Sequence, residues 1–183
     1  MLPFTAALVI TLIGAVTFWV VSRDDSGPGA SNCAARVVPE GELVAVGRDA
    51  PRFVLPELAG GCFHSASVHG RPLIVNFWAS WCRPCRTEFP LFEEARTSYG
   101  DEGLEVIGVN VQDITSDARQ FADARGAEWP LVLDEDEVVA DAFGVRSVPE
   151  TFFIAADGTV VSHVFGLTSK RDLNREIARL FDR

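Results

Sequence analysis

The chain has 183 residues, of which 48% are hydrophobic, 10% aromatic and 23% charged, and its formal net charge at pH 7 is −10. This length and composition predict one globular domain with some additional chain. Nucleic-acid phosphates need basic surfaces, so the acidic balance excludes nucleic acid as an expected partner.

The first 22 residues predict a membrane anchor. Residues 2–21 carry no charge and are rich in Leu, Val, Ile, Ala and Phe. About 20 apolar residues suffice to cross a bilayer as a helix. A cleaved signal peptide is the alternative, but it usually has a shorter apolar core after a basic start. We therefore favour an uncleaved, single-pass anchor that attaches the protein to the membrane.

Residues 23–45 predict a flexible tether, because Gly, Pro, Ala and Ser recur there without helix or strand periodicity. Arg23 follows the apolar span, so a positive-inside count does not by itself place the rest of the chain outside the cytoplasm. The expected division is an anchor at 1–22, a tether at 23–45 and a folded domain at 46–183.

The folded domain alternates apolar strand patterns with amphipathic helices. We expect strands at 73–78, 104–111 and 129–133, helices at 84–99, 116–125, 138–143 and 169–181, and hairpins at 53–68 and 151–165. Strand–helix–strand followed by a hairpin and a helix is the order of a thioredoxin-like α/β sheet. The expected fold is a three-layer sandwich with an N-terminal β-hairpin and a central helix–strand insert.

A C-x-x-C motif, Cys82-Arg83-Pro84-Cys85, lies where the strand at 73–78 turns into the helix at 84–99. The free N–H groups and positive end of a helix stabilise a thiolate, and a second thiol one turn later can close a disulfide with it. This context predicts a thiol–disulfide exchange centre with Cys82 as nucleophile and Cys85 as resolving thiol. A structural disulfide or half of a metal site is the alternative.

Three segments resemble the membrane-anchored thioredoxin-like family that includes TlpA, ResA and CcmG (DsbE). They are residues 76–90 around the C-x-x-C motif, residues 144–154 with the sequence Val-Pro-Glu-Thr-Phe, and the lead-in at 46–53. The resemblance implies an extracytoplasmic protein thiol–disulfide oxidoreductase, membrane-tethered and expected in the periplasm or its equivalent. It further implies a protein disulfide substrate, apocytochrome c or another exported protein, and a transmembrane electron donor.

The same resemblance assigns roles around the motif. Pro149 matches the family's cis-proline, so Val148 and Pro149 are expected to offer backbone hydrogen bonds to substrate. Trp81 and Glu150 are expected to contact substrate as well. Glu88 lies one helical turn after Cys85 and matches an acidic residue of the family. Since Asn76 cannot titrate where thioredoxins carry an aspartate, Glu88 or water must exchange the proton with Cys85.

Two further cysteines, Cys33 and Cys62, fit no zinc spacing. In an oxidising compartment two leftover cysteines most often pair with each other, so we expect a disulfide between the tether and the first hairpin. The three histidines form no recognisable ligand cluster and are interpreted as loop or surface residues: His64, His69 and His163.

Three alternatives to a reductant stay open at different strengths. An oxidase that introduces disulfides into secreted proteins has the same motif, and Arg-Pro between the cysteines does not separate the two. A metal-binding chaperone is disfavoured, because copper chaperones of related fold space their cysteines C-x-x-x-C and add a histidine. A peroxidase lacks its expected Pro and Thr upstream of a single cysteine. We expect no cofactor and no metal site.

Overall fold

The computed structural model describes residues 33–38 and 44–182, so the predicted anchor lies outside the described residues. Within those ranges no helix is both long and apolar enough to span a membrane. The elements in chain order are β1 (Arg36–Val38), β2 (Arg52–Pro56), β3 (Cys62–His64), η1 (Ser65–Val68), β4 (Leu73–Trp78), α1 (Arg83–Tyr99), η2 (Gly100–Glu102), β5 (Glu105–Asn110), α2 (Thr115–Arg125), β6 (Leu131–Leu133), α3 (Val138–Phe143), β7 (Glu150–Ile154), β8 (Val160–Phe165) and α4 (Lys170–Phe181).

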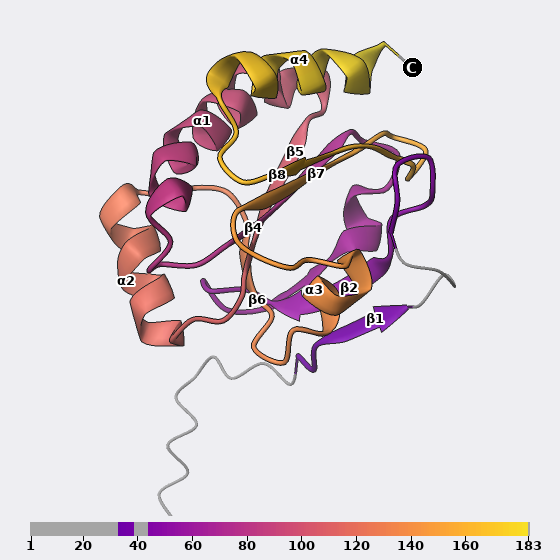
Figure 1. Ribbon diagram of the computed structural model, residues 1–183. Coiled ribbons are helices and arrows are strands. Elements are labelled where there is room, and N and C mark those ends of the chain that lie inside the picture. Colours follow the sequence, from indigo (N-terminus) through magenta and orange to yellow (C-terminus); the bar gives the residue numbers. More distant parts are fainter. Residues whose placement is uncertain (1–32, 39–43, 183) are drawn as a thin grey trace, which may run out of the picture.

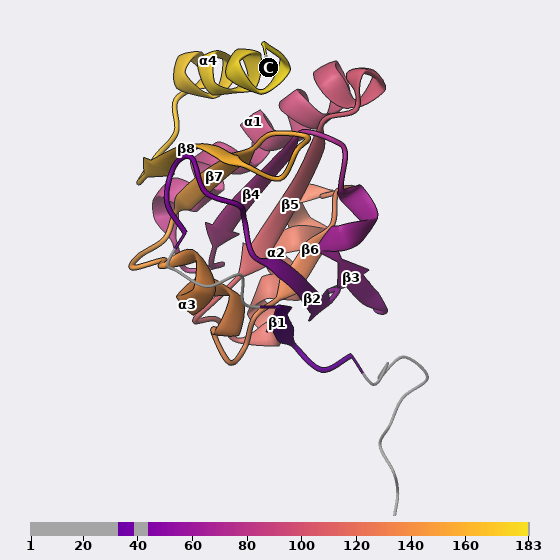
Figure 2. The same ribbon diagram turned by 90° about the vertical axis from the view of Figure 1, so that its right-hand side faces the viewer.

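A mixed five-stranded sheet forms the centre of the domain, between α1 and α3 (Figure 1). Its strand order is β6-β5-β4-β7-β8, which can be followed in Figure 2. β5 runs parallel to β4 and β6, whereas β7 runs antiparallel to β4 and β8. β1, β2 and β3 form a separate antiparallel sheet at one end of the domain (Figure 2). The expected thioredoxin-like α/β fold is confirmed, including the N-terminal hairpin and the α2–β6 insert.

β4 lies between two hydrophobic clusters, because alternate side chains of a strand point to opposite faces of its sheet. Ile74 and Trp78 belong to the cluster that includes residues of α1, α2 and α4. Val75 and Phe77 belong to the cluster that includes residues of α3 and β2. All residues of β4 are buried, as the sequence predicts. These clusters are the two interfaces of a three-layer sandwich.

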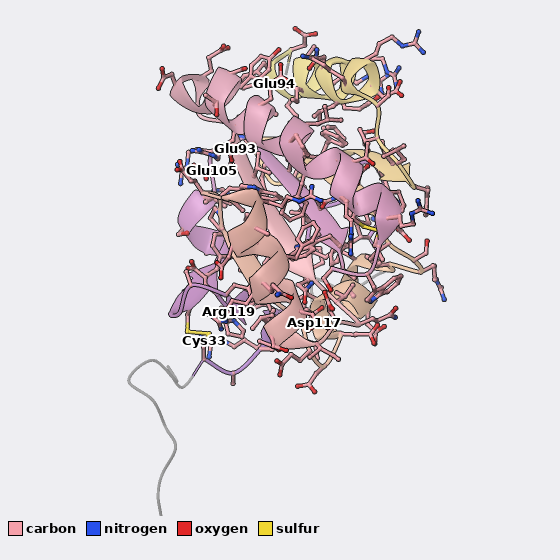
Figure 3. All side chains as sticks on the ribbon, turned by 90° about the vertical axis from the view of Figure 1, so that its left-hand side faces the viewer. Cys33, Glu93, Glu94, Glu105, Asp117 and Arg119 are labelled. Atoms are coloured by element: carbon pink, nitrogen blue, oxygen red, sulfur yellow. A yellow bond between two sulfur atoms is a disulfide. The ribbon has the colours of Figure 1, made fainter. Side chains whose placement is uncertain are left out.

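One described strand lies before the predicted domain boundary at residue 46. β1 lies within the segment predicted as a tether, and Val37 pairs with Phe53 of β2. A disulfide joins Cys33 to Cys62 of β3, which confirms the expected pairing; Figure 3 shows Cys33 at the lower edge of the domain. The strand was not predicted because three residues are too few to show the alternation of a β-strand. Its partners, β2 and the Cys33–Cys62 disulfide, cannot be inferred from composition.

Helix α1 continues through Pro90, and the neighbouring helix α2 supplies a hydrogen-bond donor at this point. Proline has no N–H, so the carbonyl of Arg86, four residues earlier, lacks its helical donor. Arg125 of α2 donates from Nη1 to that carbonyl at 2.9 Å. Its guanidinium also lies over the Phe121 ring, 4.9 Å from the centroid. The Arg86 carbonyl, which has no helical donor because of Pro90, thus accepts a hydrogen bond from α2.

Gly108 in β5 has no room for a side chain. A Cβ there would lie 2.6 Å from Leu131 Cδ2 and 2.9 Å from Trp78 Nε1. We expect Gly108→Ala to lower the free energy of unfolding by about 1–3 kcal/mol, the usual cost of overpacking. Urea denaturation measures this. Gly100→Ala is the control, because nothing lies within 4 Å of its Cβ; an equal loss in both variants would contradict the packing argument.

Candidate active site

The Cys82–Cys85 pair lies where β4 turns into α1. Cys82 is the N-cap of the helix, and its sulfur accepts the backbone N–H of Cys85 at 3.2 Å. The two sulfurs form a disulfide. Both residues are buried, with relative exposures of 3% for Cys82 and 0% for Cys85. Reduction would place the Cys82 sulfur at the positive end of a 17-residue helix, which favours a thiolate.

The loop before Cys82 is held by a carboxylate that the sequence analysis did not single out. Asp113, after β5, accepts the Ser80 hydroxyl at 2.8 Å and the Ser80 backbone N–H at 2.5 Å. It also accepts the side-chain N–H of Asn110 at 2.9 Å. Trp81 donates from Nε1 to the carbonyl of Gln112 at 2.8 Å. No motif marks the contacts of Asp113 with Ser80 and of Gln112 with Trp81, because each joins the ends of two neighbouring parallel strands that are about thirty positions apart in sequence.

Glu88 lies one turn after Cys85 and is 0% exposed. Its Oε1 accepts the backbone N–H of Thr168, in the loop between β8 and α4. Burial raises the pKa of Glu88 from 4.5 to about 7, although the Thr168 N–H acts in the opposite direction. Asn76 of β4 is buried too and donates to Thr151 Oγ1 at 3.0 Å. A carboxyl group with a pKa near neutrality can both take and return a proton at working pH.

The Val148–Pro149 peptide bond is cis, as expected from the resemblance. The pairing of β7 with β4 places Glu150 opposite Phe77, so Pro149 lies at the end of β4 from which the chain continues to Cys82. The Pro149 carbonyl accepts the N–H of Gly166 at 2.9 Å. This hydrogen bond joins the loop before β7 to the loop after β8.

Two expectations about polar residues need correction. The Glu150 side chain is 0% exposed, so it offers no surface for the substrate contact expected of it. Its Oε1 accepts the backbone N–H groups of Arg146 and Ser147, and its Oε2 lies 2.9 Å from His163 Nε2. His163 is not a loop or surface residue either: it belongs to β8, and its side chain is 17% exposed. Sequence separation concealed this pair, since Glu150 and His163 meet only when β7 and β8 align.

Exposed apolar side chains occur directly before Cys82 and in the segment at the end of β8. Trp81 is 55% exposed, consistent with the surface role expected for it. Phe165 and Leu167 are exposed as well and were not singled out from the sequence. They flank Gly166, which is hydrogen-bonded to Pro149. Such side chains can contact an apolar part of an incoming polypeptide.

A C-x-x-C pair at a helix N-terminus, a buried carboxyl group one turn later and a cis-proline at the same end of the sheet define a thioredoxin-like thiol–disulfide oxidoreductase. In the described ranges 33–38 and 44–182, no three His, Cys, Asp or Glu side chains are grouped so as to hold a metal ion.

Comparisons with known proteins agree with this class. The model of the AhpC/TSA family matches residues 46–163. Thiol-disulfide oxidoreductase ResA of Geobacillus thermodenitrificans is 34% identical over 143 residues, which cover 78% of this chain and 82% of that protein. ResA of Bacillus subtilis is 36% identical over 125 residues, 68% and 70% of the two chains. The crystal structure of a putative thiol:disulfide interchange protein DsbE from Chlorobium tepidum superposes with a TM-score of 0.71 at 30% identity, covering 75% of this chain and 98% of that one.

The chain therefore belongs to the AhpC/TSA family and, within it, to the thiol–disulfide oxidoreductases of ResA type. This confirms the resemblance found from the sequence.

The raised pKa of Glu88 makes stability depend on pH. The folded protein holds this proton up to about pH 7, while the unfolded chain releases it near 4.5. Stability therefore falls as pH rises between these values. We expect the Glu88→Gln variant to lack this fall, which amounts to about 3 kcal/mol. Unfolding free energies at pH 5 and pH 8, with both disulfides intact, measure the difference.

Glu102→Gln, at an exposed position in η2, is the matched control, and its profile should follow that of the wild-type protein. Parallel pH profiles for the wild-type protein and Glu88→Gln would contradict the burial argument.

Proposed function

We propose that the protein is a membrane-tethered, extracytoplasmic dithiol reductant that reduces disulfides of apocytochrome c or of other exported proteins. The observation that carries the exchange chemistry is the buried Glu88, one helical turn after Cys85, whose pKa is raised to about 7. That carboxyl group can accept the proton that the resolving thiol must lose. The cytochrome substrate rests on the resemblance to the TlpA, ResA and CcmG proteins.

The proposed cycle begins with the reduced protein. The Cys82 thiolate attacks one sulfur of the substrate disulfide, and the other substrate sulfur leaves as a thiolate that takes up a proton. Cys85 loses its proton to Glu88, attacks the Cys82 sulfur of the mixed disulfide and releases the second substrate thiolate, which is also protonated. The substrate gains two electrons, and the protein is left with the Cys82–Cys85 disulfide. A transmembrane electron donor would return it to the dithiol.

The surroundings of the disulfide provide a place for the substrate chain. In this proposal the backbone of Val148 and Pro149 hydrogen-bonds the incoming polypeptide, and the exposed Trp81 covers its side chains. Phe165 and Leu167 extend the apolar surface beside Gly166. Glu150 is buried and supports the loop from inside instead of contacting substrate.

Two features support the proposed location. The Cys33–Cys62 disulfide needs an oxidising compartment to persist, and the cytosol keeps thiols reduced. Residues 2–21 are long and apolar enough for a membrane anchor. An anchored domain on the oxidising side of the membrane would meet exported proteins before or during their maturation.

The order of attack predicts different outcomes for the two cysteines. With an oxidised cystine peptide, Cys85→Ser should accumulate a mixed disulfide through Cys82, because no resolving thiol is present to release it. Cys82→Ser should accumulate none. Mass spectrometry of non-reduced digests identifies the linked residue. A Cys33→Ser/Cys62→Ser double variant is the control and should retain exchange; a mixed disulfide formed through Cys85 in the Cys82→Ser variant would contradict the assignment.

The direction of electron transfer and the proposed substrate can both be tested with a peptide that carries the haem-attachment sequence C-x-x-C-H. The reduced full-length protein should reduce the cystine form of this peptide faster than that of a scrambled peptide with the same two cysteines. The opposite result, in which the disulfide form of the protein oxidises the dithiol peptide and the reduction does not proceed, would identify an oxidase. Equal rates with both peptides would refute a preference for apocytochrome c.

A further inference from the structure

A buried polar pair lies beneath the loop that carries the cis-proline. Glu150, the first residue of β7, directly follows Pro149 and is fully buried. Its Oε2 is 2.9 Å from Nε2 of His163, in the adjacent strand β8. Burying a carboxylate costs free energy unless hydrogen bonds replace its lost hydration, so each hydrogen-bond donor to Glu150 stabilises it in this position.

The other oxygen of Glu150 holds the chain just before the cis bond. Oε1 accepts the backbone N–H of Arg146 and that of Ser147, both at 2.9 Å. The carboxylate thus closes the loop 146–149 onto the start of β7. Any movement of this carboxyl group would move two backbone donors that immediately precede Val148 and Pro149.

Neighbouring rings fix the imidazole of His163. β7–β8 pairing places His163 opposite Phe152. The two rings stack with centroids 3.8 Å apart and planes inclined by 16°. The Phe165 ring lies 3.9 Å away from the imidazole, centroid to centroid. The imidazole therefore has little freedom to turn from Glu150.

The protonation state of His163 allows it to donate a hydrogen bond to the Glu150 carboxylate. Burial lowers the pKa of His163 below its usual 6.5, and Glu150 opposes this shift only in part. The imidazole is then neutral at pH 7, and Nε2 must carry the hydrogen to donate to Glu150.

We propose that His163 is a positioning residue for thiol–disulfide exchange: through Glu150 it holds the loop 146–149 in the shape that presents Val148 and Pro149 to a polypeptide substrate. In this role it acts through Glu150 and not by contact with the substrate or the cysteines. The inference rests on exchange at Cys82 but not on its direction or on a particular substrate.

His163→Phe tests this, because phenylalanine keeps the stacking on Phe152 and removes only the donor. We expect kcat/KM of the full-length protein for a cystine peptide to fall about tenfold, the equivalent of one hydrogen bond of about 1.4 kcal/mol, and to fall mainly through KM.

A small aromatic disulfide needs no contact with the loop 146–149, so the rate of its reduction should not change. His163→Gln, which retains a side-chain N–H, should recover part of the loss, and His64→Phe, at an exposed position in β3, should behave as wild type.

Amide hydrogen exchange tests the inference without any substrate. The N–H groups of Arg146 and Ser147 should exchange faster in His163→Phe than in the wild-type protein, whereas amides of β4 should not change. Unchanged exchange at Arg146 and Ser147 would overturn the proposal. So would equal losses of rate with the peptide and the small disulfide. Failure of the wild-type protein to react with either disulfide would refute the proposed exchange itself, and the amide measurement would still decide the role of His163.

Discussion

The N-cap of α1 is the interaction on which the rest of the site depends. The sulfur of Cys82 accepts the N–H of Cys85, so the helix is directed at the atom that must carry negative charge. β4, which leads into the loop of Cys82, is held in place because it is buried on both faces between two hydrophobic clusters. A helix that began one residue later would turn the first thiol away from its N-terminus. Packing of β4 and α1 is therefore the physical basis of the chemistry.

Three acidic side chains hold the loops around that point in a common manner. Asp113 accepts the Ser80 N–H before the cysteines. Glu150 accepts the N–H groups of residues 146 and 147 before the cis-proline, and Glu88 accepts the N–H of Thr168 after β8. In each case a carboxylate from one element satisfies backbone donors of a loop that would otherwise lack partners. Glu88 differs from the other two in that its raised pKa also suits it to proton exchange with Cys85.

Local pattern and motif were enough to predict much of this architecture. The apolar run at Leu73–Trp78 predicts β4 with its observed bounds, and Gly144 correctly ends the helix Val138–Phe143. Cys82, Cys85, Glu88 and Pro149 were found because their spacing or neighbouring residues form a motif. The roles of Asp113, Glu150 and His163 could not be predicted in this way. The Asp113–Ser80 and Glu150–His163 contacts are set by the alignment of β4 with β5 and of β7 with β8, and no residue type near them in sequence indicates that alignment.

The equilibrium reduction potential of the Cys82–Cys85 pair tests the central claim most directly. It should be measured on the full-length chain with Cys33–Cys62 intact, and mass mapping should confirm which disulfide is titrated. A dithiol reductant requires a potential near that of thioredoxin, about −270 mV. A potential near about −120 mV, typical of a strong disulfide donor, would contradict the proposed direction of electron flow.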